Sequence, residues 1–125
     1  MKNAVLQQIF DLVEEYLPDD WIQMILYIGY TSGSYSMKYY IKDKAGKYTD
    51  CFKQAGVSKV QLVRLFMNID KILASERKDL SAKEKWSVMT MVVDADGSVN
   101  ADYDYIDISE NTILYEQNWK AKYLK

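Results

Sequence analysis

Two aspartates in the last third of the chain have the residue type and spacing for carboxylate chemistry. Asp102 and Asp104 stand two residues apart in the segment VNADYD, and a β-strand would place both on one face, roughly 7 Å apart. Such a pair can bind a divalent metal ion or share acid–base work. Alternating acids on an exposed strand produce the same pattern more often, so this pair alone does not predict an enzyme.

The composition excludes several other chemistries. The chain has no histidine and a single cysteine, Cys51, which excludes His-based triads, His-liganded zinc and an intramolecular disulfide. We interpret Cys51 as a small buried hydrophobe. The segment DADGSVNADYD resembles a calcium loop, but with Gly97 in the sixth position the first and twelfth positions fall on Val92 and Tyr103, where carboxylates are required. We therefore expect no catalytic residue, no metal and no cofactor.

Charge is distributed unevenly, although the net charge is only −2. Seven acids and no Lys or Arg occur from Asp94 to Glu116, whereas six lysines and two acids occur from Lys38 to Lys59. Solvated strand faces and loops can explain such runs, but a dense cluster of one sign also steers a basic partner. The candidate binding residues are Asp94, Asp96, Asp102, Asp104, Asp107 and Glu110.

Membranes and nucleic acids are not the expected partners. The N-terminal segment is interrupted by polar and acidic residues, unlike a signal peptide, and no apolar run approaches the roughly 20 residues that cross a bilayer. The eleven tyrosines fall at strand spacing with few lysines between them, which favours sheet packing over base stacking. We expect a cytoplasmic protein.

Hydrophobic periodicity predicts three helices and five strands. Pro18 ends the first helix, and Ser58 with Gln61 forms a capping-box pattern that starts the second. A two-residue Asp96-Gly97 turn is expected to join the last two strands. The expected helices cover residues 2–17, 58–74 and 111–122, and the expected strands cover 21–30, 35–42, 47–52 and the two arms of the hairpin within 86–107.

These elements predict a single α+β domain over residues 1–125, in the order α-β-β-β-α-β-β-α. Short turns between consecutive strands favour an antiparallel sheet of about five strands, and amphipathic helices covering it would make a two-layer fold. The segment 21–30 is apolar on both faces, so it should be a central strand. In the last strand Val99, Ala101 and Tyr103 should pack, while Asp102 and Asp104 should face water.

Several short motifs, taken in order, resemble the YezG-like immunity proteins, which include the EsaG-type antitoxins. The resemblance covers nearly the whole chain. The motifs are Leu17-Pro18-Asp-Asp-Trp21, Tyr39-Tyr40, the hairpin with Trp86, Thr90-Met91, Asp94-Ala-Asp-Gly97 and Asp102-Tyr-Asp-Tyr105, and the ending Trp119-Lys-Ala-Lys-Tyr123-Leu124. Structural roles are expected at Pro18, Trp21, Trp86, Gly97, Tyr105 and Trp119. The loops at 31–34 and 81–85 depart from the family pattern, which leaves the class of toxin open.

The resemblance implies a small cytoplasmic protein without enzymatic activity that binds and neutralises the toxin domain, often a nuclease, of a secreted polymorphic toxin. Joined to the charge distribution, it suggests a mechanism. A nuclease holds phosphates in a basic cleft, which an acidic protein surface can occupy in place of nucleic acid. Two other functions stay open: a non-enzymatic adaptor or scaffold subunit, and a metal-dependent enzyme using Asp102 and Asp104.

Overall fold

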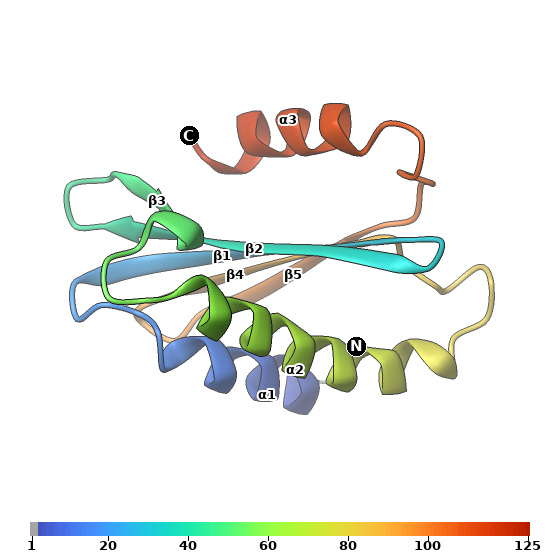
Figure 1. Cartoon of the computed structure of the whole chain (residues 1–125), viewed down its shortest axis with the longest axis horizontal. Coiled ribbons are helices and arrows are strands. Elements are labelled where there is room, and N and C mark those ends of the chain that lie inside the picture. Colours follow the sequence, from blue (N-terminus) through green and yellow to red (C-terminus); the bar gives the residue numbers. More distant parts are fainter. Residues whose placement is uncertain (1–2) are drawn as a thin grey trace.

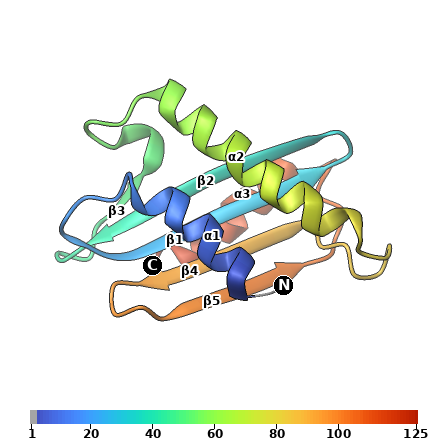
Figure 2. The ribbon, with the colours of Figure 1, turned by 90° about the horizontal axis from the view of Figure 1, so that it is seen from below.

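A computed structural model describes residues 3–125, and its elements follow the predicted order. Figures 1 and 2 show their arrangement. The elements are α1 (Asn3–Glu14), β1 (Trp21–Thr31), β2 (Ser34–Asp43), β3 (Tyr48–Asp50), a 3₁₀ turn η1 (Cys51–Lys53), α2 (Lys59–Lys78), β4 (Val88–Asp94), β5 (Val99–Asp104) and α3 (Thr112–Tyr123). The predicted start of the first helix at residue 2 lies outside the described residues.

One open antiparallel sheet of five strands, in the order β3-β2-β1-β4-β5, confirms the predicted fold class. The central position of β1 is also confirmed. Its residues Met24 to Gly29 are all buried, because both faces of this strand are covered. β3 and β5 form the two edges of the sheet.

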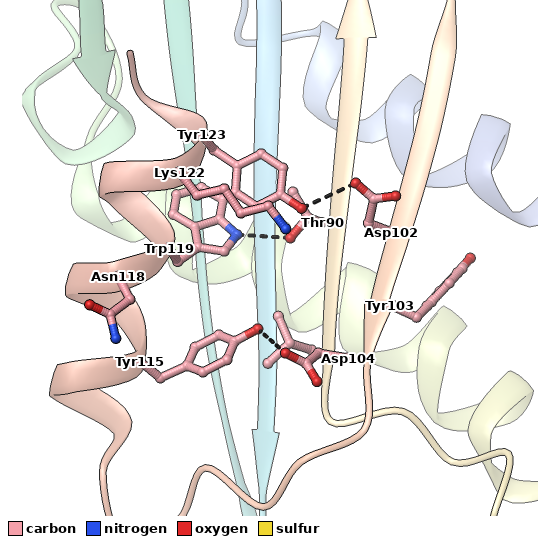
Figure 3. Close-up of a pocket in the computed structure, with 10 residues that line it drawn as sticks. Thr90, Asp102, Tyr103, Asp104, Tyr115, Asn118, Trp119, Lys122 and Tyr123 are labelled. Atoms are coloured by element: carbon pink, nitrogen blue, oxygen red, sulfur yellow. Dashed lines mark hydrogen bonds between the residues drawn. The ribbon is translucent and has the colours of Figure 1, made fainter.

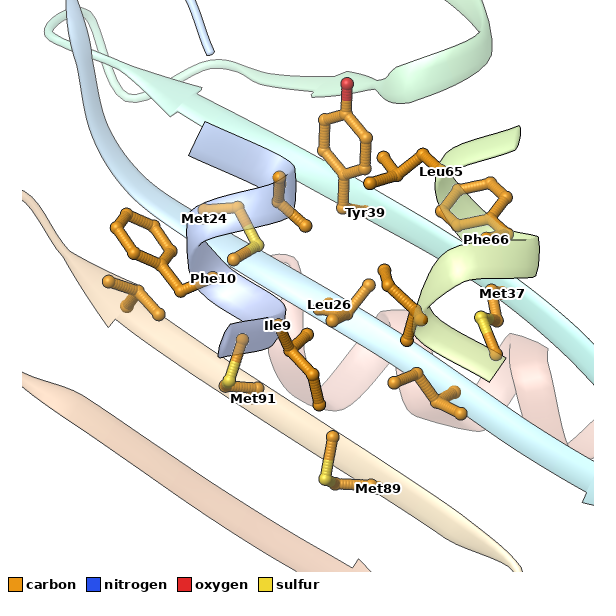
Figure 4. Close-up of a cluster of buried hydrophobic side chains, with 14 of the residues drawn as sticks. Ile9, Phe10, Met24, Leu26, Met37, Tyr39, Leu65, Phe66, Met89 and Met91 are labelled. Carbon is orange, nitrogen blue, oxygen red and sulfur yellow. The ribbon is translucent and has the colours of Figure 1, made fainter. Parts of the chain in front are cut away.

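The two long helices, α1 and α2, cover one face of the sheet, and α3 lies across the opposite face, so the fold has three layers where two were predicted (Figures 1 and 2). The larger core is therefore between the sheet and α1 and α2, where alternate side chains of β1, β2 and β4 meet the apolar stripes of both helices (Figure 4). Ile9, Leu26, Tyr39, Ile69 and Met89 have no measurable exposure in this core. Apolar surface contributes about 25 cal/mol of stabilisation per Å² when it is buried. This larger core is therefore the main source of stability.

A smaller core holds α3 against the sheet. It contains Ile25, Tyr27 and Tyr40 from the central strands, Val88 from β4, and Trp119 from α3. The Trp119 ring lies 5.1 Å from the Tyr27 ring and 5.6 Å from the Tyr40 ring. Trp119 therefore anchors α3 to the sheet.

The predicted capping box at the start of α2 is confirmed. The Ser58 side chain accepts from the Gln61 backbone N–H, and the Gln61 side chain accepts from the Ser58 N–H.

Cys51 is fully buried, as expected, and burial raises the pKa of its thiol to about 12. Among the described residues, no helix has the length and apolar content needed to cross a membrane.

Three local predictions are corrected. The β4–β5 hairpin has a three-residue loop, Ala95 to Gly97, in which Asp94 pairs with Ser98 and Gly97 takes φ +98°, the left-handed position that follows a type I turn. The predicted third strand, 47–52, ends at Asp50 because this side chain accepts from the Phe52 N–H and starts the 3₁₀ turn. The first helix ends at residue 14 instead of 17, in a turn that precedes the proline.

Candidate partner-binding site

Two tyrosines of α3 reach across to the two aspartates of β5 (Figure 3). The Tyr115 hydroxyl donates to Asp104 Oδ2 at 2.9 Å, and the Tyr123 hydroxyl donates to Asp102 Oδ2 at 3.1 Å. The prediction that this face of β5 is open to water is therefore wrong in part. Asp102 is exposed, but Asp104 is half-buried beneath α3.

The spacing of these tyrosines places both on the face of α3 that covers the sheet. Tyr115, Trp119 and Tyr123 recur every four residues, so they share one face of α3. Trp119 stands between the two tyrosines and its indole Nε1–H donates to Thr90 Oγ1 at 2.8 Å. Because both groups are buried, this bond fixes the position of α3 over β4 and β5.

An open groove of about 210 Å³ lies between α3 and strands β4 and β5. Carboxylates from β5 and aromatic rings from α3 face one another across it (Figure 3). Its lining includes Thr90, Asp102, Asp104, Tyr115, Trp119 and Tyr123. This groove, called the α3–β5 groove below, is the site at which the acidic strand and the C-terminal helix meet.

The tyrosines of the groove are hydrogen-bond donors at neutral pH. Burial raises the pKa of Tyr115, and its hydrogen bond to Asp104 raises it further. The same two causes, with Asp102 as the acceptor, raise the pKa of Tyr123. Both phenols therefore keep their protons, and both aspartates accept a hydrogen bond from a neutral group.

The remaining candidate acids lie beyond the two ends of β5. Asp94 and Asp96 are at the hairpin loop, where Asp94 accepts from the Gln23 amide at 3.0 Å. Asp107 and Glu110 are exposed in the connection to α3. Strand geometry separates the two groups by roughly 17 Å, the length of β5, so the acids form a band along one edge of the sheet.

Two of these acids also shape the local backbone. Hydrogen bonds from the Ser98 side chain and backbone lower the pKa of Asp96, and hydrogen bonds from the Ser109 backbone and side chain lower that of Asp107. Both carboxylates are therefore ionised at neutral pH. Asp96 and Asp107 thus also stabilise turns, which is typical of Asp before a tight turn.

The acids of this band carry charge that no ion pair among residues 3–125 neutralises. Within residues 3–125 the single ion pair joins Lys38 and Asp50, at 3.5 Å, on the other edge of the sheet. Over the same residues, no three acidic, thiol or imidazole side chains converge as they would around a metal ion. The band is therefore a surface suited to attracting positive charge.

The residues expected to be structural differ in their surroundings. Trp86 is buried, and Arg77 donates to its carbonyl while stacking 4.5 Å from its ring. Trp21 packs at 5.9 Å from Phe10, and Pro18 is exposed in the turn after α1. The expected structural role of Tyr105 has no support from burial, because its side chain is 58% exposed. It follows the end of β5, where Asp104 Oδ1 accepts from the Tyr105 N–H and the chain leaves the sheet.

The sequence reasoning did not identify Tyr115, Tyr123 or Thr90 as parts of the site. The four-residue spacing of the aromatic side chains in α3 was a usable signal for the first two. The Thr90–Trp119 bond had none, because it joins residues 29 apart in the sequence.

Comparison with known families identifies the class of protein. The model of the family described as "Immunity protein YezG-like" matches residues 3–125. The chain belongs to the YezG-like immunity protein family. No match was found among curated proteins.

Proposed function

We propose that this protein is the cytoplasmic antitoxin of a secreted toxin with a basic, nucleic-acid-binding active site, and that it inhibits by binding without chemistry of its own. The family supports the immunity role and a toxin domain as the partner. The acidic band supports the finer proposal. It comprises Asp94, Asp96, Asp102, Asp104, Asp107 and Glu110, and none of these forms an ion pair within residues 3–125.

Carboxylates without ion-pair partners along one edge of the sheet suit a nuclease cleft. Such a cleft concentrates Lys and Arg to hold phosphates, and an acidic surface of complementary shape attracts it at a distance and then excludes the nucleic acid. Acids at the rim of the interface mainly accelerate association, whereas fully desolvated pairs mainly slow dissociation. Inhibition of this kind needs neither a metal nor a catalytic residue.

The test reverses charge on the band without damaging the fold. Asp102 and Glu110 are exposed, so Asp102→Lys with Glu110→Lys changes the charge at two points. It removes the exposed hydrogen bond from Tyr123 to Asp102 but leaves the part-buried bond between Tyr115 and Asp104 intact. The matched control is Glu14→Lys with Glu15→Lys, because these exposed acids are at the end of α1, across the sheet from α3. Both variants shift the net charge by the same amount.

We expect the band variant to bind its cognate toxin domain more slowly and more weakly than the control, with a reduced dependence of association on salt. Surface plasmon resonance at several salt concentrations measures all three quantities. If both variants bind as the unmodified protein does, the acidic-band mechanism is wrong, while the immunity role is unaffected.

A further inference from the structure

The α3–β5 groove has the composition of a site for a single cationic side chain. Aromatic side chains at positions 115, 119 and 123 form its wall on α3, and the carboxylates of Asp102 and Asp104 face them from β5 (Figure 3). Aromatic faces attract cations through the ring quadrupole, and carboxylates accept hydrogen bonds from them. This combination distinguishes the groove from the exposed acids elsewhere in the band.

The hydrogen bonding inside the groove leaves capacity for a donor. Asp102 Oδ2 accepts from Tyr123, while its Oδ1 has no hydrogen-bond partner within residues 3–125. Tyr115 and Tyr123 already donate their single O–H protons to the aspartates. An incoming group must therefore bring its own donors and a positive charge, since the groove already contains acceptors and unneutralised carboxylates.

The size of the groove limits the ligand. Its volume of about 210 Å³ is below the roughly 300–1,000 Å³ of pockets that enclose a drug-sized molecule. A single long side chain fits this scale. Arginine suits the groove better than lysine, because a planar guanidinium stacks on aromatic rings and presents several N–H donors to carboxylates in a fixed geometry.

We propose that the α3–β5 groove binds an arginine side chain that the partner protein presents, with the guanidinium against the aromatic wall and its N–H groups on Asp102. The source of the arginine rests on the proposed function, in which the partner is a basic toxin domain. The chemistry of the groove does not, and it can be measured in the isolated protein.

The positive charge of Lys122 opposes the binding of a cation in the groove. This residue also lines the groove, and its Nζ lies 5.2 Å from the centre of the Tyr123 ring. It is too far from either aspartate to form an ion pair with them. A bound guanidinium would be repelled by this ammonium, so removal of the Lys122 charge should strengthen binding.

The experiment is an NMR titration of the full chain with N-acetyl-arginine amide, compared with N-acetyl-citrulline amide, which has the same shape without the charge. The reporter is the indole N–H of Trp119, whose ring lines the groove. We expect saturable shifts of this signal and of the Asp102 amide at millimolar arginine, and no such shifts with citrulline.

Two variants give effects of opposite sign. Asp102→Asn should weaken arginine binding about five- to tenfold, because a neutral acceptor replaces a charged one, and Lys122→Gln should strengthen it severalfold. Both substitutions are at exposed side chains, so folding is checked by the unchanged amide spectrum. Equal shifts with arginine and citrulline, no saturation, or weaker binding by the Lys122→Gln variant would overturn the proposal. Because no toxin is present, each outcome is independent of the immunity role.

Discussion

The bond between Thr90 and Trp119 makes a quantitative prediction about how α3 is held. Trp119 is 5% exposed and Thr90 3% exposed, and their hydrogen bond of 2.8 Å is fully buried. Thr90→Val replaces the accepting hydroxyl with a methyl group of similar size, which leaves the indole N–H without a partner. An unsatisfied buried donor costs about 1–3 kcal/mol, so the free energy of unfolding should fall by about this amount.

A double-mutant cycle isolates the bond from other effects of the substitution. In a Trp119→Phe background there is no N–H to satisfy, so Thr90→Val should change the free energy of unfolding by less than about 0.5 kcal/mol. Urea unfolding followed by far-UV circular dichroism measures all four proteins without relying on Trp119 fluorescence. Equal effects of Thr90→Val in both backgrounds would refute this description of how α3 is anchored.

Two further predictions concern the core and its response to pH. A Cβ at Gly29 would meet the Tyr27 hydroxyl at 2.7 Å, and Tyr27 is 1% exposed, so Gly29→Ala should lower stability by about 1–3 kcal/mol. The Tyr27 hydroxyl is buried without a hydrogen-bond partner among the described residues, so Tyr27→Phe alone should not destabilise the fold. It should also reduce the loss of stability that Gly29→Ala causes. Denaturant unfolding of the three variants tests this, and an equal loss in both backgrounds would contradict it. Burial also raises the pKa of Cys51 from its ordinary 9.0 to about 12 and that of Tyr40 from 10.0 to about 12. These groups ionise more readily when unfolded, so their contribution to stability is complete below pH 9 and is lost as the pH rises to 12; a urea midpoint that stays constant over this range would contradict the assignment.

The sheet and the two long helices over its larger core could be predicted because local signals and burial agree. The segment 21–30 is apolar on both faces and became the central strand, and Ser58 with Gln61 marked the start of α2 through a bond pattern that spans only three residues. Both signals act over short distances. Neither depends on which other elements pack nearby.

The faces of β5 show where sequence reasoning stops. Period-two alternation correctly separates Asp102 and Asp104 from Ala101 and Tyr103, but it does not indicate what covers each face. α3 has a weak apolar pattern, since Ile113 is 74% exposed while Trp119 is buried. Its position is decided by Trp119, by two tyrosine–aspartate bonds and by contacts with β1 and β4, which are distant in the sequence.

The hairpin loop shows a smaller version of the same limit. Gly97 takes a positive φ, yet the loop has three residues where two were predicted. Both loop lengths use Gly in the left-handed region. The backbone pairing of Asp94 with Ser98, which decides between them, depends on the register of the flanking strands.

The central claim is that this protein neutralises a toxin by occupying it. The most direct measurement titrates the activity of the cognate toxin domain with increasing amounts of the purified chain. Residual activity should fall in proportion to the chain added and stop falling at a fixed molar ratio, with the two proteins recovered intact as a complex. If a trace of the chain inactivates an excess of toxin over time, or if no amount reduces its activity, inhibition by binding is contradicted.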